Sequence, residues 1–197
     1  MRRDERSRDQ EPQFQSELPP RGGVLESSEV QPSASQLASW DRADKAFDVM
    51  ANTLAILTTQ NGDELAGLVV SSVATVSQHP PMFSVAVRRS HPAEGLIRAS
   101  GRLAINFLSE DSEPLVKQFG APPISGKSAF AGVEYDRGVT SGSPILRGVA
   151  AFVEGKVVKA IEAGDHTLFI AEVLDGGRLT DAPPRVCQGS YKPTSSS

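Results

Sequence analysis

The distribution of apolar residues predicts a polar leading segment followed by one domain. From Met1 to about Ser39, charged residues, Pro, Gln and Ser dominate, and apolar residues are only scattered. Such a segment buries too little apolar surface to offset the entropy lost on ordering. We therefore expect residues 1–39 to form a disordered or loosely docked arm, residues 40–192 one domain and residues 193–197 a flexible tail. The alternative is an arm that covers a partner subunit.

Helical spacing of apolar residues appears at the start of the domain. We expect Ser39 to cap a helix there. Its apolar face would hold Trp40, Ala43, Phe47 and Met50. Two further short helices are predicted, one opening at Ser90-His91-Pro92 and one at Ser112-Glu113-Pro114, because Pro is well tolerated in a first helical turn.

Most of the domain favours strands. The predicted strands are residues 53–59, 64–70, 73–77, 82–88, 103–108, 148–161 and 166–174. Asn61-Gly62 predicts a tight hairpin after the first strand, and Glu162-Ala-Gly-Asp165 a tight turn before the last. Residues 121–147 are expected to be rich in loops. We find no alternation of strands and helices and no Gly-x-Gly-x-x-Gly, which disfavours a doubly wound nucleotide-binding fold. The pattern predicts a mainly β protein, an antiparallel barrel with a few short peripheral helices.

Composition narrows the classes of function. A net charge of −4 disfavours general binding to nucleic acid or to an anionic membrane. One cysteine, Cys187, and three histidines argue against a disulfide framework and a metal centre. No apolar run is long enough for a secretory signal or a transmembrane helix. We expect a cytoplasmic protein without a metal and without a membrane or nucleic-acid partner.

A catalytic constellation of side chains is also missing from the sequence. There is no Gly-x-Ser-x-Gly, no phosphate-binding P-loop and no pair of histidines at ligand spacing. What remains is a set of hydroxyl and basic residues: Ser71, Ser72, Thr75, Ser77, Arg88, Arg89, Ser90 and His91. Hydroxyl, guanidinium and backbone N–H groups suit a phosphate-bearing ligand. The alternative is that these side chains only face solvent, and spacing alone leaves both open.

Five segments follow one another over roughly residues 44–191. They are Thr53-Leu-Ala-Ile-Leu-Thr-Thr, Gly67-Leu-Val-Val-Ser-Ser-Val-Ala-Thr-Val-Ser-Gln-His-Pro-Pro81, Ser100-Gly-Arg-Leu-Ala-Ile-Asn-Phe-Leu108, Gly142-Ser-Pro-Ile-Leu and Ala163-Gly-Asp-His-Thr-Leu-Phe-Ile-Ala-Glu-Val173. In this order they resemble the segments of the flavin reductase family. The resemblance implies the FMN-binding split antiparallel β-barrel of that family.

The resemblance also implies an activity. Similar proteins are NAD(P)H:flavin oxidoreductases that pass a hydride from NADH or NADPH to FMN or FAD. Their reduced flavin diffuses to a partner monooxygenase. It further implies a homodimer with flavin sites near the subunit interface. The alternative is a flavin- or ligand-binding split-barrel protein without reductase activity, such as a carrier, a partner module or a recruited non-redox enzyme.

Carried over position by position, the resemblance assigns a set of cofactor-binding residues. The flavin ring would lie along the backbones of Gly67, Leu68, Val69 and Val70, with Ser71, Ser72 and Ser77 as hydroxyl partners. The next strand would meet the flavin at Ala86, Val87 and Arg88, and the phosphate would approach Arg89, Ser90 and His91. Gly189 and Tyr191 would close the nicotinamide side.

His166 is the one candidate catalytic residue that the resemblance supplies. It would border the nicotinamide, and the alternative is a histidine that anchors the turn. Two segments depart from the family pattern: a polar run is replaced by Leu68-Val-Val, and the C-terminal segment is Pro184-Arg-Val-Cys-Gln-Gly189. This segment lines the nicotinamide side in relatives, so flavin binding is the firmer expectation and hydride transfer the weaker.

Overall fold

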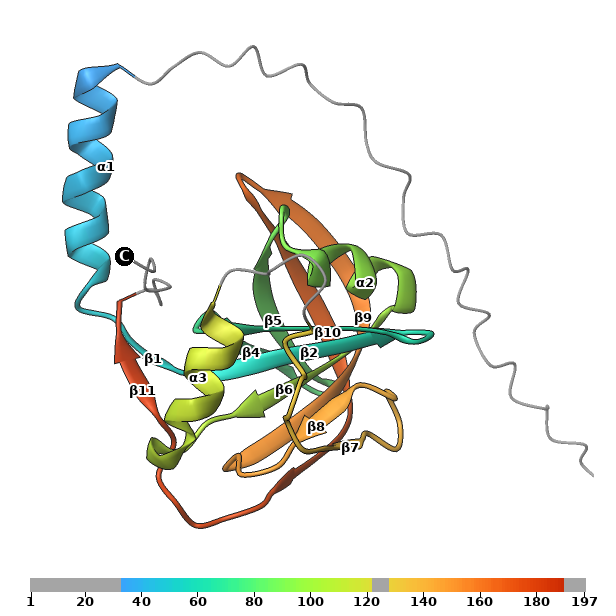
Figure 1. Cartoon of the computed structure of the whole chain (residues 1–197). Coiled ribbons are helices and arrows are strands. Elements are labelled where there is room, and N and C mark those ends of the chain that lie inside the picture. The colour runs from blue at the N-terminus through green and yellow to red at the C-terminus, as the bar shows by residue number, and fades with distance from the viewer. Residues whose placement is uncertain (1–32, 122–127, 190–197) are drawn as a thin grey trace, which may run out of the picture. The chain divides into compact units, whose positions relative to one another are not determined.

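The computed structural model describes residues 33–121 and 128–189 (Figure 1). The chain divides into two units, Met1–Gln31 and Pro32–Ser197, and every described residue belongs to the second. Most of the predicted arm and the predicted tail therefore lie outside the described residues.

The described helices are short and mostly as predicted. They are α1 (Ala34–Phe47), α2 (Pro92–Ser100) and α3 (Glu113–Gly120), with a 3-10 turn, η1 (Glu110–Ser112), before α3. The predicted cap at Ser39 is wrong, because α1 begins five residues earlier. Ser33 caps it in a capping box: Ser33 Oγ accepts from Gln36 N at 3.3 Å, and Gln36 Oε1 accepts from Ser33 N at 2.8 Å. This reciprocal pair satisfies two N–H groups.

Eleven strands are present in the described residues. They are β1 (Ala51–Thr53), β2 (Ala55–Asn61), β3 (Glu64–Val70), β4 (Ala74–Gln78), β5 (Pro81–Arg88), β6 (Arg102–Phe107), β7 (Tyr135–Arg137), β8 (Pro144–Leu146), β9 (Ala151–Ala163), β10 (His166–Arg178) and β11 (Val186–Gln188). Seven form one antiparallel sheet in the order β3-β2-β6-β9-β10-β5-β4. This confirms the mainly β antiparallel prediction. The small sheets β1-β11 and β7-β8 were not predicted.

Both predicted tight turns are present. Gly62 (φ +59°) joins β2 to β3, and Gly164 (φ +59°) joins β9 to β10. A residue with a side chain is strained at such angles, whereas Gly is not. The second turn aligns β10 against β9 and, on its other side, against β5.

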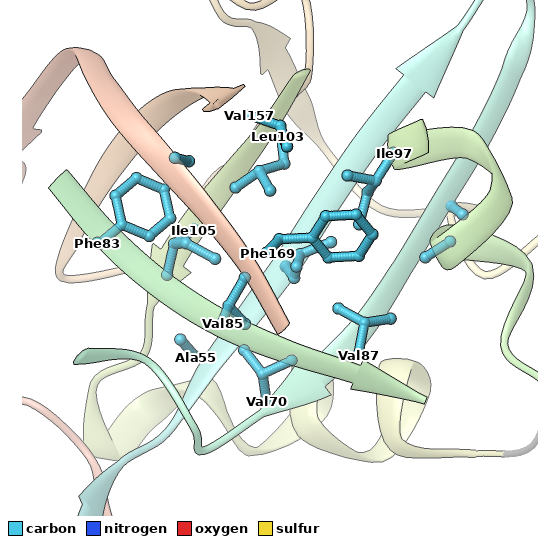
Figure 2. Close-up of a cluster of buried hydrophobic side chains, with 14 residues drawn as sticks. Ala55, Val70, Phe83, Val85, Val87, Ile97, Leu103, Ile105, Val157 and Phe169 are labelled. Atoms are coloured by element: carbon cyan, nitrogen blue, oxygen red, sulfur yellow. The ribbon is translucent and has the colours of Figure 1, made fainter. Parts of the chain in front are cut away.

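Two apolar clusters fill the fold. The first lies inside the barrel and gathers Phe169 of β10, Val85 and Val87 of β5, and Ile97 of α2 (Figure 2). The second includes Val69 of β3, Val116 and Phe119 of α3, and Phe130. Strand β3 contributes to both clusters, since its successive side chains point to opposite faces. Helices α2 and α3 both pack against β3.

No helix within residues 33–121 and 128–189 combines the length and apolarity that crossing a bilayer requires.

Candidate functional site

The end of β5 and the start of β10 form a corner that brings five of the predicted polar residues together: Arg88, Arg89, Ser90, His91 and His166. Arg88 pairs with His166 across the two strands. The backbone N–H of Arg89 donates to the carbonyl of Asp165 at 2.9 Å. The β5–α2 turn, which holds Arg88, Arg89, Ser90 and His91, therefore lies against the β9–β10 turn. Pairing of distant strands thus unites the predicted phosphate and nicotinamide residues.

The charged side chains of this corner pair with two acids of the β9–β10 turn. Arg89 Nη1 lies 3.5 Å from Glu162 Oε2, and Arg88 Nη1 lies 4.0 Å from Asp165 Oδ2. The side chains of Arg88 and Arg89 are 62% and 49% exposed. Exposed pairs of this kind contribute little to stability and exchange readily with other charges. Both guanidinium groups are therefore available to an anionic ligand.

His166 has a fixed hydrogen-bond partner. Its Nδ1 lies 2.7 Å from Asp165 Oδ1. This hydrogen bond is the main reason that the pKa of Asp165 lies below its ordinary value, and the charges of His166 and Arg88 lower it further. The ionised carboxylate favours a proton on Nδ1, which directs the other ring nitrogen, Nε2, away from the turn.

His91 caps the first turn of α2. Its Nδ1 accepts from Ala93 N at 3.2 Å, and its carbonyl accepts from Glu94 N at 3.0 Å. Pro92 has no N–H. Burial lowers the pKa of His91, so the ring is neutral near pH 7, accepts through Nδ1 and carries its proton on Nε2. The first N–H groups of α2 are therefore occupied, and an anion here would bind side chains.

A buried carboxylate lies beneath the corner. Glu94, which is 8% exposed, accepts from Arg98 Nε and from Thr167 Oγ1, both at 2.7 Å. Sequence reasoning missed Glu94, Thr167, Glu162 and Asp165. Two signals were present: Glu94 and Arg98 have the spacing of a helical ion pair, and Asp165 directly precedes His166. The contact between Glu94 and Thr167 had none, because the two lie 73 positions apart.

The β3 residues of the predicted ring-binding segment offer mainly backbone. The side chains of Val70 and Val87 lie in the barrel cluster and that of Val69 in the cluster under α3. A Cβ on Gly67 would lie 2.7 Å from the Phe119 ring, so this glycine permits close packing of α3. Leu68 is partly buried against the barrel cluster. Since β3 is at the edge of the seven-stranded sheet, one side of its backbone faces no further strand of that sheet.

Ser72 is engaged by the protein itself. Its Oγ accepts from Ala86 N at 3.1 Å and donates to Ala86 O at 3.3 Å. The hydroxyl thus ties the β3–β4 connection, which includes Ser71, to β5. A hydroxyl has one proton and two lone pairs, so Ser72 can still accept a hydrogen bond from a ligand but has no second proton to donate.

Three further predicted residues belong neither to the corner nor to the β3 segment and its connection to β4. Ser77 is on β4, opposite Met82 of β5. Gly189 follows β11, donates to Met50 O at 2.8 Å and accepts from Asn52 Nδ2 at 3.0 Å, which ties it to the β1-β11 sheet. Tyr191 lies outside the described residues. The closing role predicted for Gly189 and Tyr191 stays a prediction.

Two of the cavities in the described chain lie away from this corner. One of about 670 Å³ is lined by Phe152, Glu154 and Leu179 among others, at the end of the β9–β10 ribbon far from its turn. Another, of about 720 Å³, lies between the β2–β3 hairpin and α2. Neither of these two is lined by a predicted site residue. The corner is open to solvent at Arg88 and Arg89, whose side chains are largely exposed.

Comparison with known proteins agrees with this fold. Residues 47–195 match the model of the family described as Flavin reductase like domain. Diflavin flavoprotein A 1 of Synechocystis sp. is 33% identical over 143 residues, which cover 72% of this chain and 25% of that protein. Flavin reductase (NADH) of Kitasatospora aureofaciens is 31% identical over 132 residues, which cover 66% of this chain and 68% of that protein. The chain thus spans about a quarter of the first relative.

A solved structure shows the same fold. NADH:FAD oxidoreductase SgcE6 of Streptomyces globisporus C-1027 superposes with a TM-score of 0.69 at 24% identity, covering 87% of this chain and 95% of that one. The predicted split-barrel class is confirmed.

Proposed function

The chain belongs to the flavin reductase-like family, and from this premise we propose that it is an NAD(P)H:flavin oxidoreductase acting on FMN or FAD. The observation that carries the proposal is the corner at which β5 meets β10. It places two exposed arginines beside a histidine whose Nδ1 is held by Asp165. These groups suit the phosphate of a flavin nucleotide and the polar amide of a nicotinamide.

The residues present fit the phosphate end of such a ligand. Arg88 and Arg89 supply guanidinium donors, and His91 supplies Nε2–H, because its Nδ1 already accepts from Ala93. Charge-assisted hydrogen bonds from Arg to phosphate are short and strong. The ligand phosphate would replace Asp165 and Glu162 as the partner of the two arginines.

The ring of the flavin would lie along β3. The backbone of residues 67–70 and the free lone pair of Ser72 Oγ would meet its polar edge, and Leu68 would contribute apolar contact. Hydride transfer is chemistry that flavin and nicotinamide supply when both are bound. The protein contributes orientation, which accounts for the absence of a side-chain catalytic constellation from the sequence. His166 would position the nicotinamide through Nε2.

The same proposal includes the assembly and the partner. We propose a cytoplasmic homodimer in which the second copy covers the open corner. We also propose that its partner is a flavin-dependent monooxygenase, which receives the reduced flavin by diffusion. The open position of Arg88 and Arg89 supports this arrangement, since a redox site gains from exclusion of water. Sedimentation of the full chain tests it: the mass of two chains is expected, and the mass of one would overturn the dimer.

NADH and NADPH consumption by the full chain tests the activity, with FMN, with FAD and without flavin. Consumption that rises with added flavin is expected. Flavin binding without consumption would overturn the reductase proposal in favour of a non-redox flavin-binding protein. Absence of flavin binding would overturn both.

A further inference from the structure

Glu94 is a carboxylate in a place where a charge is costly. It lies on the first turn of α2 and is 8% exposed. A charge taken out of water is tolerated only where it is paired and hydrogen-bonded. Arg98 Nε, one helical turn later, donates to Glu94 Oε1 at 2.7 Å and supplies the compensating charge.

The second donor to Glu94 belongs to another element. Thr167 Oγ1 donates to Glu94 Oε1 at 2.7 Å, and Thr167 is fully buried. Thr167 directly follows His166 on β10 and pairs with Val87, the residue before Arg88, on β5. One carboxylate oxygen therefore joins the helix that follows the phosphate-binding turn to the strand that follows His166.

The network continues to the surface of the corner. Arg98 Nη2 lies 3.6 Å from Glu162 Oε1, and Arg89 Nη1 lies 3.5 Å from Glu162 Oε2. Arg98 Nη2 also lies 3.4 Å from Thr167 Oγ1. Through Arg98, the Glu94 network therefore reaches Glu162 at the edge of the corner. Its buried members, Glu94 and Thr167, are hydrogen-bonded to each other, and a satisfied buried polar contact of this kind fixes one arrangement.

We propose that Glu94 and Thr167 are positioning residues for the phosphate-binding turn. They fix α2 against β10. Because the turn from Arg88 to His91 joins β5, which pairs with β10, to α2, this contact also fixes the turn. Neither residue touches the flavin. The inference rests on the proposed function, because it needs the turn to bind the flavin phosphate. It goes further by separating the residues that contact the phosphate from those that hold them in place.

Removal of the Thr167 hydroxyl tests the proposal. Thr167→Val keeps the shape but leaves Glu94 without one donor, and Thr167→Ser keeps the hydroxyl as the matched control. Dissociation constants are measured for FMN and for riboflavin, which has the same ring and no phosphate. We expect Thr167→Val to lower the preference for FMN over riboflavin about tenfold, since a hydrogen bond to a charged group has that order of effect. Thr167→Ser should keep the preference.

Other outcomes separate the possibilities. Equal weakening of FMN and riboflavin binding by Thr167→Val would assign these residues a merely structural role and overturn the inference. Unchanged binding of both flavins would overturn it too. If wild-type protein binds neither flavin, the proposed function fails first. Glu94→Gln, which removes the charge and retains an acceptor oxygen, gives a second measurement if Thr167→Val does not fold. It is expected to change the preference in the same direction.

Discussion

Strand β9 carries one glutamate near each end, and the two lie in opposite environments. Glu154 is 1% exposed, and its Oε2 accepts from the backbone N–H groups of Ser141 at 2.6 Å and Thr140 at 3.2 Å. Glu162 is 54% exposed and pairs with the side chains of Arg89 and Arg98. The same residue type thus accepts from backbone N–H groups at one end of the strand and pairs with arginine side chains at the other.

The difference shows which end is scaffold and which is available to a ligand. A buried carboxylate bound to backbone N–H groups cannot change partner without leaving those groups unsatisfied. Gly138 is adapted to it, because a Cβ there would clash with Glu154 Oε2. An exposed pair between long side chains has no such constraint, since water and other ions compete for it. Chemistry is therefore expected at the Glu162 end and stability at the Glu154 end.

The largest expected effect is a loss of folding stability when the buried contacts of Glu154 are removed. Glu154→Ala should reduce the free energy of unfolding by about 2–4 kcal/mol, because two buried N–H groups lose their acceptor. Glu162→Ala, on the same strand, is the matched control and should cost less than about 1 kcal/mol. Urea unfolding of both variants measures this. Equal losses would show that the two ends do not differ as described.

The next effect concerns ligand binding at the two ends. Arg89→Ala should weaken FMN binding about tenfold, the effect of losing one charge-assisted hydrogen bond. The matched control is Arg147→Ala at the far end, where the arginine pairs with Asp136 at 3.1 and 3.2 Å and its side chain is also exposed. Titration of FMN into each variant measures the change. A similar loss in Arg147→Ala would mean that general positive charge, not the corner, attracts the flavin.

A smaller effect should appear with pH. Burial by itself would raise the pKa of Glu154, but hydrogen bonds from Ser141 and Thr140 outweigh it, and the pKa lies below its ordinary value of 4.5. A lowered carboxyl pKa stabilises the fold above the unfolded-state value, and this contribution is lost as pH falls towards the folded value. The stability difference between wild type and Glu154→Gln should be constant from neutral pH to about 5 and shrink below 4.5. Urea unfolding across this range measures it; a difference that grows in acid would contradict the assignment.

The smallest expected effect is a gain in FMN affinity. Glu162→Gln removes the carboxylate that competes with a ligand phosphate for Arg89, so FMN binding should tighten by about two- to fivefold at low salt. The gain should vanish at high salt, where the ion pair is screened. Weaker FMN binding in this variant would show that Glu162 holds Arg89 in its binding position and does not compete.

The fold was largely predictable because its signals are local. Short β-favoured and apolar runs predict the strands, and Asn61-Gly62 predicts a hairpin that needs a positive φ at Gly62. The apolar spacing starts at Trp40 and so points to a cap at Ser39, while the actual cap at Ser33 lies in polar sequence. The β1-β11 and β7-β8 sheets were missed because three-residue strands carry too little pattern.

The candidate site was only partly predictable because its partners are distant in sequence. The turn from Arg88 to His91 could be named from residue types alone. Two contacts depend on strand register: the hydrogen bond that Ser72 Oγ donates to the Ala86 carbonyl and the one that Thr167 Oγ1 donates to Glu94. Contacts of this kind follow from the folded arrangement and have no local signature.

The closed first turn of α2 has a consequence for how long a ligand stays. Because the N–H groups of Ala93 and Glu94 donate to His91, they are not available to a phosphate. The phosphate would be held mainly by the guanidinium groups of the corner, which pair with carboxylates when no ligand is bound. Each departure of the ligand is then compensated by an ion pair that re-forms, which keeps residence short. Under the proposed function, short residence would favour release of reduced flavin to a second enzyme. Because ion pairs are screened by salt, the dissociation rate of the ligand should rise with ionic strength.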